Sequence, residues 1–244
     1  MTGGQSRLFK TTAWSLVRAA QNRAGPEYID AMNRFIAGYW KPVFYFIRAR
    51  GCPLQTAEDL TQEFFGMFLV KDWLDPADPE RGRFRSFLLK ILQRFLADRS
   101  PGRARKQVTF DQQLVCISSL MGDDEQSFEP PSTEVPEDIF MRQWARAVID
   151  NVSRRVELWC RNKGRPDWYQ IFMADHFPAS GAKRPSQEAL AKQFRVTRDQ
   201  IRHALAQTKQ QFGHELQEEL SDQLTGDVDI PGEIGELERL LGKK

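Results

Sequence analysis

Residues 186–205, SQEALAKQFRVTRDQIRHAL, carry the pattern that decides the fold of the C-terminal half of the chain. Two short amphipathic helices fit this stretch, with a turn between them at Arg195. Ser186 can cap the first helix, and Thr197 followed by Gln200 makes a capping box that starts the second. The apolar residues are spaced to meet between the two helices: Leu190, Ala191, Phe194, Val196, Ile201 and Leu205. The stretch therefore predicts a helix-turn-helix unit.

The second helix of this unit would present polar side chains to solvent: Arg198, Asp199, Gln200, Arg202 and His203. Arg can read guanine and Gln can read adenine in the major groove, and the first residues of a recognition helix reach the bases. The turn residue, commonly Gly, is Arg195 here, and a left-handed Arg costs about 1 kcal/mol relative to Gly. The alternative interpretation is an ordinary helical hairpin with a solvated basic face.

Helical periodicity extends over most of the remaining chain. Apolar residues recur every three or four positions, strand-like alternation is scarce, and Asp167 can cap a short helix that ends near Phe177. With 244 residues, 41% of them apolar, the chain can bury one large core or two small ones. We predict an all-α protein with an N-terminal extension (1–25), a first helical domain (26–106), an acidic linker (107–137), a helix-turn-helix domain (138–215) and an acidic tail (216–244).

Charge alternates in blocks along the chain, although the net charge is only +2. Residues 81–106 hold nine Lys or Arg and one acid, whereas residues 107–138 hold eight acids and no Lys or Arg. Residues 183–209 hold seven Lys or Arg against two acids, and residues 215–238 hold nine acids and no Lys or Arg. This separation indicates two anion-binding surfaces joined by an acidic spacer.

The first basic block surrounds an amphipathic helix predicted at 84–98. Basic side chains grip phosphates, and aromatic residues can stack on unstacked bases. Phe84, Phe87 and Phe95 fit a protein core better than a stacking surface, and Arg83, Lys90 and Arg94 could form a merely solvated face. The block predicts nucleic-acid binding. The alternative is that its aromatic residues form core and its basic residues are merely solvated.

A helix predicted near 56–69 carries Asp59, Gln62 and Glu63 on one face. These carboxylates have no His or metal partner nearby in sequence, so they fit a solvated or partner-binding face better than general acid–base catalysis. The three Cys and three His are scattered and form no CxxC pair, so we expect no metal and no cofactor. No apolar run approaches the roughly 20 residues of a membrane span, and the first residues lack a signal-peptide core. These features predict a cytoplasmic protein without a membrane span.

The chain resembles bacterial RNA polymerase sigma factors of the extracytoplasmic-function (ECF) class, within the sigma-70 superfamily. YWKPVFYFIRARG (39–51) and AEDLTQEFF (57–65) are similar to the family's core-binding segments. ERGRFRSFLLKILQRFLAD (80–98) is similar to the promoter-melting and −10-reading segment, and 186–205 to the −35-reading helix-turn-helix. TTAWSLVRAA (11–20) and GEIGELERLL (232–241) resemble extensions in a branch common in planctomycetes and related bacteria.

The resemblance implies roles for individual residues. Contacts to the clamp helices of the largest polymerase subunit would come from Asp59, Leu60, Gln62, Glu63 and Phe65. The loop at 75–83 would capture a flipped −10 base, which needs a preformed pocket because unstacking costs a few kcal/mol. Contacts to −10 DNA would come from Arg81, Arg83, Arg85, Lys90, Arg94, Arg99, Arg103, Arg105 and Lys106. Contacts to −35 DNA would come from Arg198, Asp199, Gln200, Arg202 and His203.

Two positions depart from the family pattern. Gln93-Arg94 stands where many members have an Asn that helps hold the flipped base, and Pro101-Gly102 interrupts a helix that is usually continuous. These two departures bear on which −10 sequence is read. By the same resemblance, the acidic linker corresponds to the interdomain spacer that runs toward the active centre and RNA exit channel of the polymerase.

The resemblance implies a dissociable sigma factor that binds core RNA polymerase and promoter DNA and is not itself an enzyme. The resemblance also leaves open a further partner, namely an anti-sigma factor or another regulator. The alternatives are a stand-alone helix-turn-helix regulator that binds a palindrome as a dimer, an interaction module that binds no DNA, and an unrelated helical enzyme. The acidic tail would either dock on the basic helix-turn-helix or, more simply, extend the last helix.

Overall fold

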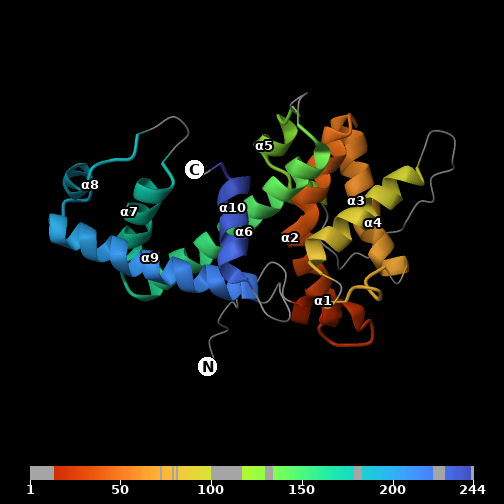
Figure 1. The fold of residues 1–244 in the computed structure, drawn as a ribbon, viewed down its shortest axis with the longest axis horizontal. Helices are drawn as coiled ribbons and strands as arrows, with labels where there is room; N and C mark the ends of the chain where they lie inside the picture. The colour runs from red at the N-terminus through yellow and green to blue at the C-terminus, as the bar shows by residue number, and fades with distance from the viewer. Residues whose placement is uncertain are drawn as a thin grey trace. The chain divides into compact units, whose positions relative to one another are not determined.

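The computed structural model describes residues 14–71, 73–78, 80, 82–99, 117–129, 134–178, 183–221 and 229–242. Every regular element in these ranges is helical, so the all-α prediction is confirmed (Figure 1). The elements are α1 (Trp14–Gln21), α2 (Tyr28–Ala49), α3 (Leu54–Val70), α4 (Phe84–Ala97), the 3-10 turn η2 (Ile117–Leu120), α5 (Asp123–Gln126), α6 (Pro136–Asn162), α7 (Pro166–His176), α8 (Gln187–Phe194), α9 (Arg198–Ser221) and α10 (Ile230–Leu240).

The chain divides into two compact units, with boundaries inside α6, after Val148, and inside α9, after Glu219. Among the described residues, the first unit comprises 14–148 and 220–242, and the second comprises 149–219.

An aromatic core holds the first unit together. The ring of Phe35 on α2 makes edge contacts with Phe65 and Phe68 of α3 and with Phe84 of α4, at centroid distances of 5.2 to 5.7 Å. Phe64 packs in the same way on Phe95, with centroids 5.3 Å apart. Edge-to-face pairs of this kind add about 0.5–1.5 kcal/mol each to the gain from burial. Phe84 and Phe95 are buried, so their assignment to the core is confirmed, whereas Phe87 is only half-buried.

The start of α4 is fixed by Gly82 and Phe84. Gly82 has a φ of 116°, a left-handed backbone that glycine adopts without steric cost. Phe84 then enters the core against Phe35 and Trp14, whose ring centroids lie 5.7 and 5.8 Å away. This turn sets the direction of Arg83 and Arg85, which flank Phe84 in the sequence.

Part of the predicted linker is folded onto α2. Ile117 is fully buried, and the ring of Phe128 lies 4.3 Å from that of Tyr45. Arg48 donates to the Phe128 carbonyl at 2.8 Å, and Lys41 pairs with the buried Glu125 at 2.9 Å. Residues 117–129 therefore belong to the first unit. The remainder of the predicted linker is described only at 134–137.

The second unit has a small core shared by α7, α8 and α9. Its buried members are Ile171, Leu190, Ile201, Ala204 and Leu205, with Ala191, Phe194 and Val196 packed against them. The prediction that Asp167 caps α7 is wrong: the cap position is Arg165, and Pro166 begins the helix. Proline suits the first helical position because the N–H that it lacks has no partner there in any case.

The acidic tail does not simply continue the last helix. α9 ends at Ser221, and α10 is a separate helix whose capping residue, Asp229, accepts a hydrogen bond from Gly232 N–H at 2.9 Å. Pro231 lies in the first turn of α10, the only part of a helix that tolerates proline without losing a bond. The simpler expectation for the tail is therefore wrong beyond Ser221.

Candidate nucleic-acid interface

Side chains cap both helices of the α8–α9 pair, as predicted. The Ser186 hydroxyl accepts from Ala189 N–H at 3.1 Å. Gln200 N–H donates to the Thr197 hydroxyl at 3.2 Å, while Thr197 N–H donates to the Gln200 side-chain oxygen at 2.8 Å. Between the helices, Arg195 has φ 55° and ψ 44°, the left-handed conformation. The turn therefore carries the strain expected of a non-glycine residue at this position.

All five residues predicted to read −35 DNA are exposed on the first turns of α9: Arg198, Asp199, Gln200, Arg202 and His203. Several are already engaged within the chain. Arg202 pairs with Asp199, and the His203 ring packs edge-on against Trp168 at 5.4 Å. The side-chain oxygen of Gln200 is occupied by its capping bond, and bidentate pairing with adenine needs both that oxygen and the amide nitrogen. Gln200 acts as a cap in this structure.

The predicted −10 residues lie in different environments. Lys90 and Arg94 are exposed on α4. Arg99 stacks on Phe95, 3.7 Å from the ring centroid, and forms a two-pronged ion pair with Glu63. Arg81, Arg103, Arg105 and Lys106 lie outside the described residues.

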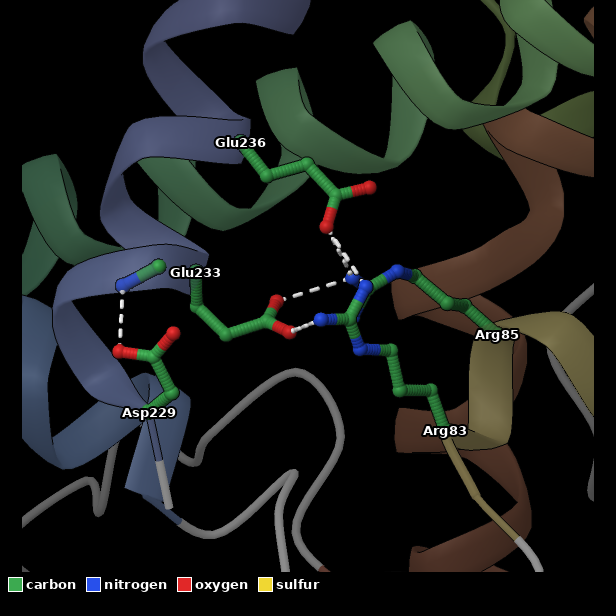
Figure 2. Close-up of polar contacts among 6 residues, drawn as sticks. Arg83, Arg85, Asp229, Glu233 and Glu236 are labelled. Carbon is green, nitrogen blue, oxygen red and sulfur yellow. Dashed lines mark hydrogen bonds and ion pairs between the residues drawn. The ribbon is translucent and has the colours of Figure 1, made fainter.

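Arg83 and Arg85 face the carboxylates of α10 (Figure 2). Arg85 is only 2% exposed and contacts Glu233 at 2.9 Å and Glu236 at 3.1 Å. Arg83, which is 43% exposed, pairs with Glu233 as well and with Glu236 at 2.6 Å. On its other side the guanidinium of Arg85 lies 4.0 Å from the ring centroid of Trp144 on α6. In this arrangement the Arg85 side chain is not accessible to DNA.

The predicted polymerase-binding residues of α3 are likewise only partly accessible. Asp59 is exposed, but Leu60 is 9% exposed and Phe65 is fully buried in the aromatic core. Gln62 accepts a hydrogen bond from Ile117 N–H at 2.8 Å, and Glu63 is paired with Arg99. Leu60 and Phe65 position the helix, so the surface that a partner could contact is smaller than the motif suggests.

Sequence reasoning missed the residues that contact Arg83 and Arg85, namely Trp144, Glu233 and Glu236. Local signals for the covering helix were present, because Asp229 followed by Pro231 is a typical helix start. Nothing local indicated where that helix would dock.

A charged cluster anchors the chain before α8. Arg184 pairs with the buried Asp175 through two bonds, at 2.9 and 2.5 Å, and this pairing raises the pKa of the guanidinium. Burial lowers the pKa of His176, which stacks on Phe172 with centroids 4.5 Å apart, although Asp175 acts in the opposite direction. The cluster holds the N-terminal approach to α8 in place.

Comparisons with known proteins identify no relative: no family model, no curated protein and no solved structure matches the chain. Within the described ranges, no group of three or more His, Cys, Asp or Glu side chains is arranged to hold a metal ion. None of the described helices is both long and apolar enough to cross a membrane.

Proposed function

We propose that this chain is a sigma factor of the ECF class, which binds core RNA polymerase and directs it to promoters. In this proposal α8 and α9 are a helix-turn-helix that reads −35 DNA, and the first unit binds the polymerase and −10 DNA. The polymerase carries out the phosphoryl transfer, so the chain needs no catalytic residues, and it acts in the cytoplasm.

The observation that carries the proposal is the α8–α9 pair. It has capped helices and a packed core, and an exposed group of Arg, Gln and His side chains sits at the start of α9. That is where a recognition helix contacts base edges. The sequence motifs that resemble the sigma family at 39–65 and 80–98 add the polymerase-binding role, which a stand-alone regulator would not need.

The test is co-elution of the full chain with purified core RNA polymerase in size-exclusion chromatography. Asp59→Ala is the informative variant, because Asp59 is exposed, whereas Glu63→Ala would also break the ion pair with Arg99. Glu58→Ala, one residue away on the same helix, is the matched control.

We expect the wild type and Glu58→Ala to co-elute and Asp59→Ala to bind at least about thirtyfold more weakly, the loss of about 2 kcal/mol that defines an interface hot spot. If the wild type fails to co-elute but binds duplex DNA, the stand-alone regulator replaces the sigma factor as the best description. Equal binding by all three proteins would remove Asp59 from the docking face.

A further inference from the structure

Two guanidinium groups of the first unit converge on one cluster of carboxylate oxygens. Glu233 and Glu236 each contact both Arg83 and Arg85 (Figure 2). Arginine pairs with phosphate through the same planar, two-pronged geometry that it uses with carboxylate. The carboxylates therefore occupy positions that nucleic-acid phosphate oxygens could take.

The guanidinium of Arg85 has a support that does not depend on α10. Trp144 belongs to α6, and its ring lies 4.0 Å from the guanidinium carbon of Arg85. Stacking on tryptophan is a favourable contact for a cation and limits its rotation. The turn at Gly82 and the buried ring of Phe84 fix the backbone on which Arg83 and Arg85 lie. Departure of α10 would leave the Arg85 guanidinium held against Trp144, with Arg83 two residues away in the sequence.

The pairing between α10 and this site is incomplete. The Nε of Arg85 is buried but has no hydrogen-bond partner among the described residues. An ion pair that is buried at this depth loses most of its Coulombic gain to desolvation, and it stabilises strongly only when every donor is satisfied. The ion pair itself therefore adds little net stability to the contact, so a phosphate that satisfies the same guanidiniums would compete with Glu233 and Glu236 for them.

The form of α10 also suits exchange. The helix has its own capping residue, Asp229, and its own proline start, so it does not depend on α9 for its first turn. Three of its residues are acidic, and only Glu233 and Glu236 face the arginines, whereas Glu238 is exposed.

We propose that Arg83 and Arg85 form a phosphate-binding site for single-stranded nucleic acid, and that Glu233 and Glu236 of α10 occupy this site in the free protein. The strand and α10 would then compete for the same two guanidiniums. The single-stranded form of the nucleic acid and its identity as promoter DNA rest on the proposed function, but the competition between phosphate and carboxylate does not.

The test compares two full-length variants that remove one charge each from α10. Glu236→Gln weakens the contact with both arginines, and Glu238→Gln, two residues away, makes the same change at an exposed position. The measurement is fluorescence anisotropy with a labelled single-stranded DNA of random sequence, over a series of salt concentrations.

We expect Glu236→Gln to bind the strand about fivefold or more tightly than the wild type, the lower end of typical coupling between two sites. Its salt dependence should be steeper by up to about 1.4 in the log–log slope, if both arginines gain a phosphate. Glu238→Gln should match the wild type, and Arg83→Gln in the Glu236→Gln chain should remove most of the gain. Equal gains in both glutamine variants, or none in Glu236→Gln, would show that α10 is only a structural brace.

A second measurement covers the case in which Glu236→Gln unfolds. Hydrogen exchange of the wild-type chain is followed with and without the same single-stranded DNA. Competition predicts faster exchange at residues 230–240 when the strand is bound, with α3 unchanged. Unchanged or slower exchange in α10 would overturn the proposal. Because neither experiment contains polymerase, their outcome is independent of whether the chain co-elutes with it.

Discussion

Arg195 shows how a single backbone angle limits the stability of the candidate recognition unit. It is the one described non-glycine residue with a positive φ, at 55°. The left-handed region costs an L-residue roughly 1–2 kcal/mol because its Cβ approaches the following carbonyl oxygen. Leu190 and Ile201, both fully buried on either side of the turn, hold the two helices together against that cost.

Replacing this residue by glycine should therefore stabilise the chain. We expect Arg195→Gly to raise the free energy of unfolding of the second unit by about 0.5–1 kcal/mol, since glycine relieves the strain but also gains entropy when unfolded. Urea denaturation followed by circular dichroism measures the change.

Arg195→Ala separates backbone strain from charge. Alanine keeps a Cβ, so this variant should show no such gain, although it loses the same positive charge. A comparable gain with alanine would mean that charge repulsion, and not the left-handed backbone, limits stability at the turn.

At the scale of elements, a buried carboxylate is one of the contacts that hold the segment 117–129 on α2. Glu125 is 3% exposed and joins α5 to α2 through Lys41 at 2.9 Å and the Tyr45 hydroxyl at 3.4 Å. Burial raises the pKa of Glu125, but hydrogen bonds from Lys41 and from Gly122 N–H outweigh it, so the pKa lies below its ordinary 4.5. The same carboxylate adds to burial in raising the pKa of Tyr45 to about 12.

The direction of this shift gives a pH dependence. Because Glu125 titrates lower in the folded chain, its contribution to stability is complete above pH 4.5 and is lost as the pH falls through its folded pKa. We expect Glu125→Gln to cost about 1–3 kcal/mol at neutral pH, the range for a buried group that loses part of its pairing. The effect should shrink below the folded pKa, where the wild-type carboxyl is also neutral.

Thermal unfolding across the acidic range, with hydrogen exchange at 117–129, measures this effect. Asp124→Asn is the control, because it makes the same chemical change on an exposed neighbour. Loss of protection in both variants would show that overall charge, and not the Glu125 contacts, holds the segment.

The sequence predicts best those features that are set by residues close together in the chain. The caps at Ser186 and Thr197 follow from local spacing and are confirmed, and the helix predicted at 84–98 is observed at Phe84–Ala97. The resemblance implies a partner contact for Phe65, which is buried here, because a motif does not distinguish an inward ring from an outward one. The docking of Glu233 on Arg85 joins residues 148 positions apart, and no local pattern encodes such a contact.

At the scale of the whole molecule, the exposed cations predicted to contact DNA are divided between the two compact units. Lys90 and Arg94 belong to the first compact unit, and Arg198 and Arg202 to the second. Mutational losses at sites that share no partner add within about 0.5 kcal/mol. When two surfaces of one chain bind the same DNA, binding through one surface raises the effective concentration of the other at that DNA. This linkage does not make the contacts of one surface depend on the contacts of the other.

We therefore expect additive losses on a DNA fork that combines a duplex with a single-stranded end. Two double variants should each weaken binding: Lys90→Glu/Arg94→Glu and Arg198→Glu/Arg202→Glu. The variant with all four substitutions should lose the sum of the binding free energies that the two double variants lose. On single-stranded DNA alone only the first variant should lose affinity, and on duplex alone chiefly the second. Anisotropy titrations at one fixed salt concentration provide all of these values. If the variant with all four substitutions binds no more weakly than either double variant, the two groups of cations serve one common site. The division of DNA recognition between the units would then have to be abandoned.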